Sequence, residues 1–407
     1  MFHKQVVDEI NVAGKRVLVR VDYNVPFAPD GTISDDYRVR ASLPTIEYLV
    51  SRGCRVVLCA HLGRPDGKRT EKDSLKPVFE LLSGLLQDRS YFVDAVVGEE
   101  VARASGELAG GEVLLLQNLR FEAGEEENSL EFAQRLVDDT GAEIFVQDGF
   151  GVCHRKSATT EVITHILPAV AGFLVKKEVS ELTEVVDEPK RPFIAILGGA
   201  KVNDKIPILK KIIDKADKIF LGGAMANAFL RFNKYEIGLS HADDDADTDI
   251  EEIYALAQAK TDEVNEFLVL PSDVVIASEI SAKTETAVTE IDNVYDQDMI
   301  LDIGPESRKA IGSALENAKT VFWNGTMGVS EYSKFAHGSN YVARTMGRMD
   351  ADTVVCGGDT AGFVINFAKD KDDLHYSLIS TGGGASLELL GGEKLVGVES
   401  LMNKEVK

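Results

Sequence analysis

The sequence has no long hydrophobic run, no apolar leader and few cysteines. No stretch approaches the ~18 consecutive apolar residues that a membrane-spanning helix needs. The opening residues, MFHKQVVDEI, lack the apolar region of a secretory signal. The four cysteines, Cys54, Cys59, Cys153 and Cys356, form no CxxC pair, so we interpret them as free thiols in a reducing compartment. We therefore expect a soluble, cytoplasmic protein with no membrane partner.

Positive charge is also scarce. The 407 residues include 44 Lys and Arg against 67 Asp and Glu, which gives a formal net charge of −23. Such an acidic chain is a poor general binder of nucleic acid or anionic membrane, because both are negatively charged. The acidic residues between positions 243 and 252 fit either adaptation to a salty cytoplasm, where such charges are screened, or an ordinary acidic protein. The sequence leaves these two alternatives open.

The chain does contain a regular alternation of short apolar runs with helix-like stretches. In the first half the apolar runs are residues 16–21, 55–60, 113–116 and 144–146, and residues 40–51 and 130–140 have the pattern of helices. This alternation predicts an α/β fold with parallel sheets flanked by helices, and the length suggests two domains. In such sheets ligands bind beyond the carboxyl ends of the strands. The residues that follow each run are therefore candidates for function.

Cationic residues follow the strand-like runs of the first half or stand before a predicted helix. The sequences concerned are HLGRP at 61–65, QNLRF at 117–121, QDGFGVCHR at 147–155 and the segment around Arg38. Any one of these cations could form an ordinary surface ion pair. Because Arg binds phosphate or carboxylate bidentately, the recurrence in an acidic chain predicts a pocket for a small, highly anionic substrate.

Residues 168–186 have the pattern of one long amphipathic helix. The sequence DEPKRP at 187–192 follows, and its two prolines and its charges are typical of a boundary. We expect this helix to bridge two domains.

Glycines, rather than arginines, follow the apolar runs of the second half. These runs are residues 193–197, 219–221, 267–270, 274–277, 321–323, 354–356 and 376–379. Five of them lead into LGGAK, LGGAM, WNGTMG, CGGDT or STGGGAS. Each could be a simple tight turn, but together they indicate a site where backbone approaches a phosphorylated ligand. Asp359 is placed to meet a magnesium–phosphate complex, and Asn324 and Glu331 would lie at the same rim.

The first glycine turn of this half lies within residues 193–209. The apolar run 193–197 predicts a buried strand, Gly198 and Gly199 end it, and a helix is predicted from Ala200 onward. Lys201 and Lys205 would then share one helical face beside a helix N-terminus, which favours phosphate. The alternative is an ordinary strand, turn and helix with two solvated lysines.

Nine ordered motifs make the chain resemble the phosphoglycerate kinase family over nearly its full length. They are RVDYNVP (20–26), AHLGRPDG (60–67), LLQNLRF (115–121), QDGFGVCHR (147–155), AVAGFLVKKEV (169–179), AILGGAKVNDKI (195–206), FWNGTMGVSE (322–331), GGDTA (357–361) and STGGGASLELL (380–390).

The resemblance implies two Rossmann-like domains with a cleft and a hinge between them. It places a phosphoglycerate-binding domain at residues 1–170, an interdomain helix and hinge at 171–190, a nucleotide-binding domain at 191–387 and a tail at 388–407 that packs back on the first domain. The implied reaction is reversible phosphoryl transfer between 1,3-bisphosphoglycerate and ADP, giving 3-phosphoglycerate and ATP, in glycolysis and gluconeogenesis. The implied cofactor is Mg²⁺, and the implied state is a monomer.

The resemblance also assigns site residues. The phosphoglycerate site would comprise Asp22, Asn24, Arg38, His61, Leu62, Gly63, Arg64, Arg120 and Arg155. Nucleotide positions would be Lys205, Asn324, Glu331, Gly357, Gly358, Asp359 and Thr360, with Asp359 meeting the metal. The catalytic set would be Arg38, Lys201 and the backbone of Gly382, Gly383 and Gly384.

The chain departs from the usual family pattern at three turns. It has QDGFG where the family often has NDAFG, Thr326 where proline is usual, and Cys356 where glycine is usual. These changes affect turn stiffness, and no ligand-contacting Arg, Lys or Asp is lost.

Rival classes lack their own signatures in this chain. A dinucleotide-dependent oxidoreductase requires GxGxxG with an acidic residue about 20 positions later, and a P-loop kinase requires GxxxxGK[ST]. Neither spacing is present. A non-catalytic relative of the kinase would have lost Arg38, Lys201 or Asp359, and all three are retained.

Overall fold

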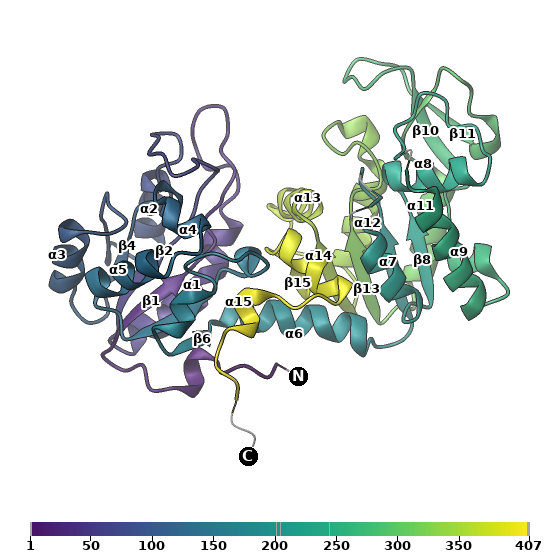
Figure 1. Ribbon diagram of the computed structural model, residues 1–407. Helices are drawn as coiled ribbons and strands as arrows, with labels where there is room; N and C mark the ends of the chain where they lie inside the picture. The colour runs from purple at the N-terminus through teal and green to yellow at the C-terminus, as the bar shows by residue number, and fades with distance from the viewer. Residues whose placement is uncertain (1, 201, 204, 244, 405–407) are drawn as a thin grey trace. The chain divides into compact units, whose positions relative to one another are not determined.

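The computed structural model describes residues 2–200, 202–203, 205–243 and 245–404. The chain forms two compact units (Figure 1). Unit 1 comprises Met1–Ser180 and Lys394–Lys407, and unit 2 comprises Glu181–Glu393. None of the helices in the described part of the chain has the length and apolar character that a bilayer crossing requires.

Unit 1 is built on a six-stranded parallel sheet in the order β3-β4-β2-β1-β5-β6. The strands are β1 (Arg16–Arg20), β2 (Arg55–Cys59), β3 (Ser90–Phe92), β4 (Val113–Leu115), β5 (Ile144–Gln147) and β6 (Ala169–Ala171). The helices are α1 (Tyr37–Ser51), α2 (Lys76–Leu85), α3 (Glu99–Glu107), α4 (Ala123–Glu126), α5 (Leu130–Thr140) and α15 (Val396–Glu399), and α6 (Phe173–Asp187) runs from this unit into the next. Short 3-10 turns are η1 (Val7–Glu9), η2 (Leu119–Phe121), η3 (Phe150–Val152) and η4 (Val162–His165).

Unit 2 contains a second six-stranded parallel sheet, in the order β15-β14-β13-β7-β8-β9, and a three-stranded antiparallel sheet, β11-β10-β12. The strands are β7 (Phe193–Leu197), β8 (Lys218–Leu221), β9 (Leu268–Val269), β10 (Asp273–Ala277), β11 (Ala287–Glu290), β12 (Met299–Ile303), β13 (Thr320–Asn324), β14 (Asp352–Cys356) and β15 (Leu378–Ile379). The helices are α7 (Ile206–Ile213), α8 (Gly223–Phe232), α9 (Asp247–Lys260), α10 (Val264–Phe267), α11 (Pro305–Leu315), α12 (His337–Gly347), α13 (Gly358–Ala368) and α14 (Gly384–Gly391), with 3-10 turns η5 (Ile291–Asn293) and η6 (Ser333–Phe335).

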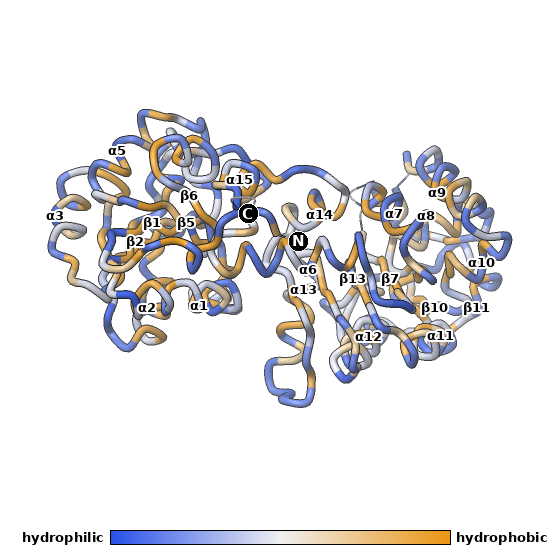
Figure 2. The backbone as a smooth tube through the Cα atoms, turned by 90° about the horizontal axis from the view of Figure 1, so that it is seen from below, coloured by the Kyte–Doolittle hydropathy of each residue, from blue (hydrophilic) through white to orange (hydrophobic). Residues whose placement is uncertain are grey.

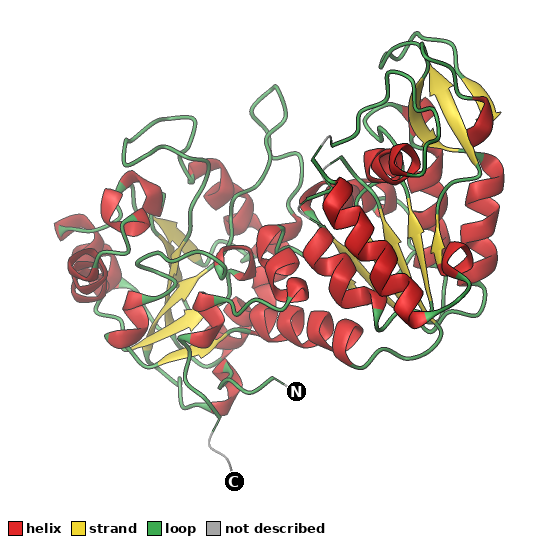
Figure 3. Cartoon of the chain, turned by 45° about the vertical axis from the view of Figure 1, so that its right-hand side comes forward, coloured by secondary structure: helices red, strands yellow, loops and turns green. Residues whose placement is uncertain are grey.

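Both large sheets have helices on their two faces, as Figure 3 shows. The middle residues of the central strands are therefore apolar, which is typical of parallel sheets. In unit 1, Val17, Leu18 and Val19 of β1 are fully buried, and β1, β2 and β5 are coloured as hydrophobic in Figure 2. In unit 2, Trp323 of β13 is paired with Ile196 of β7, and both are fully buried. The predicted α/β class with parallel sheets is confirmed.

Local sequence explains several element boundaries. Helix α5 occupies the predicted residues 130–140 because Ser129 caps its start, accepting a hydrogen bond from Phe132 N, and Gly141 ends it with a left-handed φ of 61°. Helix α1 begins at Tyr37, so Arg38 lies in its first turn and not before it.

The prediction of one helix over residues 168–186 was wrong. Ala169–Ala171 forms strand β6, which pairs with β5, and helix α6 begins only at Phe173. Gly172 separates the two elements at a point where a Cβ atom would lie 2.0 Å from Oδ1 of Asp148. A three-residue strand of small side chains does not produce a periodic pattern that distinguishes it from the helix that follows.

The prediction of a helix from Ala200 was also wrong. Helix α7 begins at Ile206, with Lys205 at its N-cap and Pro207 in its first turn. The described residues between the glycines and the helix contact neighbouring loops instead, since Gly199 N donates to Thr326 O and Val202 N donates to Asp243 Oδ2. Lys201 lies outside the described residues.

The antiparallel sheet of unit 2 was not predicted. The run at 274–277 belongs to β10, which pairs with β11 and β12 rather than with the large sheet. The run at 267–270 begins as the end of α10 and continues as the two-residue strand β9. An apolar run specifies a buried segment, but it does not specify which neighbour it pairs with.

Candidate functional site

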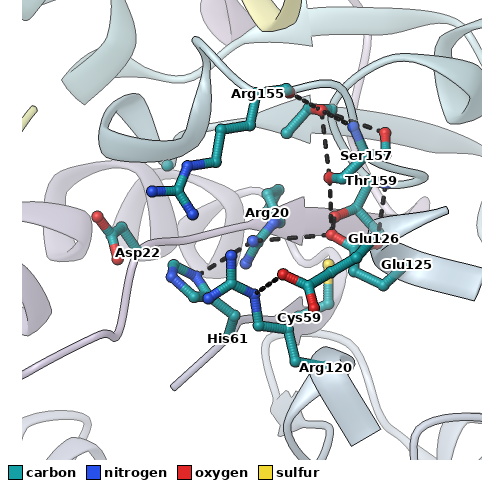
Figure 4. Close-up of polar contacts among 12 residues, drawn as sticks. Arg20, Asp22, Cys59, His61, Arg120, Glu125, Glu126, Arg155, Ser157 and Thr159 are labelled. Atoms are coloured by element: carbon teal, nitrogen blue, oxygen red, sulfur yellow. Dashed lines mark hydrogen bonds and ion pairs between the residues drawn. The ribbon is translucent and has the colours of Figure 1, made fainter. Parts of the chain in front are cut away.

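The candidate residues of unit 1 follow neighbouring strands that end at the same edge of the sheet. Arg20 at the end of β1 is paired with Cys59 of β2 on one side and with Gln147 of β5 on the other. The loops that follow β1, β2 and β5 therefore start side by side. The structure brings Asp22, His61 and Arg120 into one network at this edge (Figure 4).

Asp22 and Arg38 form an ion pair there, with Asp22 Oδ2 at 2.7 Å from Arg38 Nη1. Asp22 is buried, and burial alone would raise the pKa of its carboxyl group. The charge of Arg38 and the hydrogen bond from Asn24 N outweigh burial, so that the pKa of Asp22 is lowered from its ordinary value. The Arg38 side chain remains 28% exposed, which leaves part of the guanidinium accessible to a ligand.

The backbone of Gly63 is held between two candidate side chains. Asn24 Oδ1 accepts a hydrogen bond from Gly63 N at 2.9 Å, and Arg120 Nη1 donates to Gly63 O at 2.7 Å. Gly63 has a positive φ of 63°, and a Cβ atom there would lie 2.3 Å from Oδ1 of Asp73. Glycine is therefore required at this turn. Leu62 N and O are both bonded to the side chain of buried Asn118, which sequence reasoning did not single out.

Arg120 and Arg155 are close enough to influence each other. Arg120 is nearly buried and forms an ion pair with Glu126, Nε to Oε1 at 3.1 Å. Burial lowers the pKa of Arg120, and the charges of Arg155 and Arg20 lower it further. Arg155 is exposed, and its Nε donates a hydrogen bond to His154 Nε2. Arg64, in the loop after β2, is also exposed.

Sequence reasoning missed two buried charged residues in this network, Arg20 and Glu125. Arg20 is 2% exposed and lies at the end of the central strand, and Glu125 is 2% exposed in α4. They are paired, Arg20 Nη2 to Glu125 Oε1, at 3.9 Å. The available signal was an arginine directly after the apolar residues 17–19 of the strand, because charged groups are seldom buried without a partner.

The candidate residues of unit 2 line a cavity of about 890 Å³. Its wall includes Lys205, Asn324, Glu331, Gly357, Gly358, Asp359 and Thr360, which are all of the predicted nucleotide positions. It also includes apolar side chains such as Leu239, Ile280 and Met299. A mixed cavity of this size fits a nucleotide-sized ligand.

Several glycines around this cavity allow loops to touch one another. A Cβ atom on Gly325 would lie 2.1 Å from Gly198 O, and one on Gly198 would lie 2.3 Å from Thr326 O. Gly325 has a φ of 91° and donates from N to the Thr360 hydroxyl at 2.7 Å. These glycines pack backbone against backbone. A Cβ atom on Gly358, by contrast, would have no neighbour within 4 Å, so the start of α13 is open to a ligand.

Asp359 is exposed in the first turn of α13, beside the N-cap Gly357. The helix N-terminus places unpaired N–H groups and partial positive charge next to this carboxylate. Among the described residues, no group of three or more His, Cys, Asp or Glu side chains could hold a metal ion. One carboxylate completed by phosphate oxygens is nevertheless a usual arrangement for Mg²⁺.

The glycines at 382–384 lie at the start of α14, outside the residues that line the cavity. Gly383 is the N-cap and Gly384 the first helical residue. Gly382 N donates to the Ser380 hydroxyl, which is 2.6 Å from the Ser386 hydroxyl. Leu387 of this helix reaches the cavity wall.

Comparison with known proteins decides the family. A family model for phosphoglycerate kinase matches residues 7–393. The chain belongs to the phosphoglycerate kinase family. It is 44% identical over 400 residues to the phosphoglycerate kinase of Prochlorococcus marinus (strain MIT 9312), covering 97% of each chain. It is 45% identical over 401 residues to that of Moorella thermoacetica (strain ATCC 39073 / JCM 9320), covering 98% of this chain and 100% of the relative.

Solved phosphoglycerate kinase structures have the same fold. The structure from Coxiella burnetii superimposes with a TM-score of 0.82 at 33% identity, and the one from Pyrococcus horikoshii OT3 with a TM-score of 0.83 at 29% identity. Each alignment covers 98% of both chains. The family and the enzyme class expected from the motifs, a phosphoglycerate kinase, are confirmed.

Proposed function

We propose that unit 1 binds 3-phosphoglycerate or 1,3-bisphosphoglycerate, that unit 2 binds the magnesium complex of ADP or ATP, and that the chain transfers a phosphoryl group between them. The observation that carries this proposal is the gathering of Asp22, Arg38 and Arg120 around His61 at one sheet edge. A small anion with several charged oxygens suits such a cluster.

The transfer requires charge neutralisation and positioning more than covalent help. Arg38, Lys201 and the N–H groups at the start of α14 would stabilise the negative charge of the phosphoryl group in flight. Asp359 would hold Mg²⁺, which supplies further positive charge to the phosphates. No general base is required for a carboxylate acceptor, because it is already ionised at neutral pH.

The two ligands would be held by different units, so the reaction requires that the units bring them together. Residues around α6 are our candidates for the hinge. The domain boundaries at 1–170, 171–190, 191–387 and 388–407, the monomeric state and the cytoplasmic location also stay predictions.

A coupled assay tests the function. The purified protein is mixed with 3-phosphoglycerate, MgATP, glyceraldehyde-3-phosphate dehydrogenase and NADH, at low and at molar KCl, with the coupling enzyme checked at each salt concentration. We expect NADH loss that requires both substrates. Activity only at molar KCl would favour salt adaptation over an ordinary acidic protein. No NADH loss at either concentration from a folded protein would contradict the proposal.

A further inference from the structure

The buried side chain of Arg20 donates hydrogen bonds to two acceptors at the sheet edge of unit 1. Its Nη1 donates to Val21 O at 3.0 Å, and its Nη2 lies 3.3 Å from Nδ1 of His61 (Figure 4). Arg20 and His61 are 2% and 4% exposed. The contact between them is thus shielded from water.

Glu125 balances the charge of Arg20 on the other side. Its Oε1 lies 3.9 Å from Arg20 Nη2 and accepts hydrogen bonds from Ser157 Oγ at 2.8 Å and Thr159 Oγ1 at 2.7 Å. Its Oε2 accepts one from Thr159 N at 3.1 Å. A buried guanidinium is destabilising unless it is paired in this way. The carboxylate therefore fixes where the guanidinium lies, and Arg20 in turn lies against the imidazole.

The contact decides which nitrogen of His61 carries the proton. A guanidinium has only N–H donors and no acceptor. Nδ1 of His61 must therefore be the acceptor, and it carries no proton. A doubly protonated ring has no acceptor nitrogen, so the ring is neutral and its single proton is on Nε2.

We propose that Arg20, supported by Glu125, is a positioning residue that holds His61 as the neutral Nε2–H tautomer, so that His61 offers the ligand of unit 1 a hydrogen-bond donor without a charge. The identity of that ligand rests on the proposed function. Arg38, Arg120 and Arg155 then supply the positive charge of the site. His61 supplies a hydrogen bond that fixes the orientation of the ligand.

The electrostatic surroundings of His61 agree with a neutral ring. Burial lowers the pKa of His61 well below its ordinary value, and the charges of Arg20, Arg120 and Arg38 lower it further. Asp22 acts in the opposite direction, but its carboxylate is paired with Arg38. Within the described part of the chain, these are the charged groups that shift the pKa of His61.

Nitrogen-15 NMR of the histidine-labelled full chain tests the proposal without substrate. The chain has seven histidines, so the His61 signals are identified by their loss in His61→Gln. We expect wild-type His61 to show one species, with Nε2 protonated and Nδ1 accepting, and no titration from about pH 5.5 to about pH 8. A protonated Nδ1 at neutral pH would overturn the proposal.

Two variants isolate the role of Arg20. Arg20→Met alone would leave the Glu125 carboxylate buried without its cation, so we compare Glu125→Gln with the double variant Arg20→Met/Glu125→Gln. The two proteins differ only in Arg20. We expect Glu125→Gln to keep the wild-type tautomer, because the amide oxygen that replaces the carboxylate can still accept a hydrogen bond from the guanidinium. The double variant should gain a measurable Nδ1–H population and a raised His61 pKa, because both the donor and the nearby charge are lost. Indistinguishable His61 spectra in the two variants would overturn the proposal.

Ligand binding provides a readout that depends on function. Calorimetry should show about tenfold weaker binding of 3-phosphoglycerate at about pH 8 by the double variant than by Glu125→Gln, which is the effect of one directed hydrogen bond to an anion. The difference in affinity between the two variants should become smaller as pH falls, because the His61 ring of the double variant, no longer held by Arg20, can then be protonated and attract the anion by its charge. Absence of 3-phosphoglycerate binding by every protein would contradict the proposed function, whereas the NMR result would still decide the tautomer.

Discussion

The two units use similar sheets in different chemical ways. Each has a six-stranded parallel sheet in which the first strand of the unit, β1 or β7, is central. The sheet edge of unit 1 carries cationic side chains, some of which pair with carboxylates, such as Arg38 with Asp22 and Arg120 with Glu126. After the strands of unit 2 come glycines whose backbones are in contact. We therefore expect the same sheet edge to recognise anions through side-chain charge in unit 1 and through backbone N–H groups in unit 2.

This difference predicts different sensitivities. Unit 1 should respond most to changes of charge, because its cations and carboxylates are partly or fully buried and depend on each other. Unit 2 should respond most to changes of volume, because a methyl group at Gly198 or Gly325 would meet the backbone of a neighbouring loop. Substitutions of each kind can confirm or break this contrast.

The largest effect is expected from Arg38→Ala. Loss of its guanidinium should reduce kcat on the order of 10²–10³-fold, as removal of one transition-state donor does. Nucleotide binding by unit 2 should be unchanged. The matched control is Arg40→Ala, since Arg40 is an exposed residue of the same helix that pairs with Asp36 at 2.8 Å. Turnover near the wild-type value in Arg38→Ala would show that Arg38 does not have the proposed role.

A smaller effect on the other unit is expected from Gly325→Ala. The added methyl group would meet the Gly198 carbonyl, which costs about 1–3 kcal/mol of overpacking and displaces the loop. Affinity for ADP, measured by calorimetry, should fall about tenfold or more, with 3-phosphoglycerate binding retained. Gly392→Ala is the control, because Gly392 has a similar φ of 95° without a backbone clash. Equal ADP binding by the two variants would break the contrast between the units.

The smallest effect concerns a feature that the units share, a buried carboxyl group at a helix start. Asp148 accepts a hydrogen bond from Leu174 N in α6, and Asp302 accepts one from Gly338 N in α12. Burial raises the pKa of each to about 7 despite these bonds. Between about pH 4 and pH 7 the folded chain therefore binds protons that the unfolded chain has released. The free energy of unfolding should fall as pH rises through this window, by at most about 1.4 kcal/mol per pH unit for each group.

Replacing either carboxyl group by an amide removes its share of this pH dependence. We expect Asp148→Asn and Asp302→Asn each to show a shallower fall of unfolding free energy from about pH 5 to about pH 7, measured by urea unfolding. Asp350→Asn, at an exposed position, is the control. A wild-type slope in both buried variants would show that these carboxyl groups are ionised throughout the window.

The sequence predicted the parts of the molecule that depend on neighbours along the chain. Helix α5 and most strands of the large sheets were predicted because apolar periodicity and capping residues are local signals. The start of α7 and the strand β6 were not, because contacts of Gly199 and Gly172 with distant segments decide them. Arg20 and Glu125 were missed for the same reason, since the partners of a buried charge lie far away in the sequence. All seven nucleotide positions predicted from the motifs nevertheless line the cavity of unit 2, whereas its apolar wall residues, such as Leu239 and Ile280, were not predicted.

The two ends of unit 1 are joined to each other. Lys4 is buried, and its ammonium donates to Glu399 O at 2.7 Å and to Asn403 Oδ1 at 2.8 Å, where the first and last described segments run side by side in Figure 1. The ribosome makes the segment from Lys394 onward only after the whole of unit 2. The full sequence of unit 2 is therefore synthesised before that of unit 1, although unit 1 is begun first. The partners of Lys4 at positions 399 and 403 are synthesised after unit 2, so these contacts of unit 1 can form only once the sequence of unit 2 has been made.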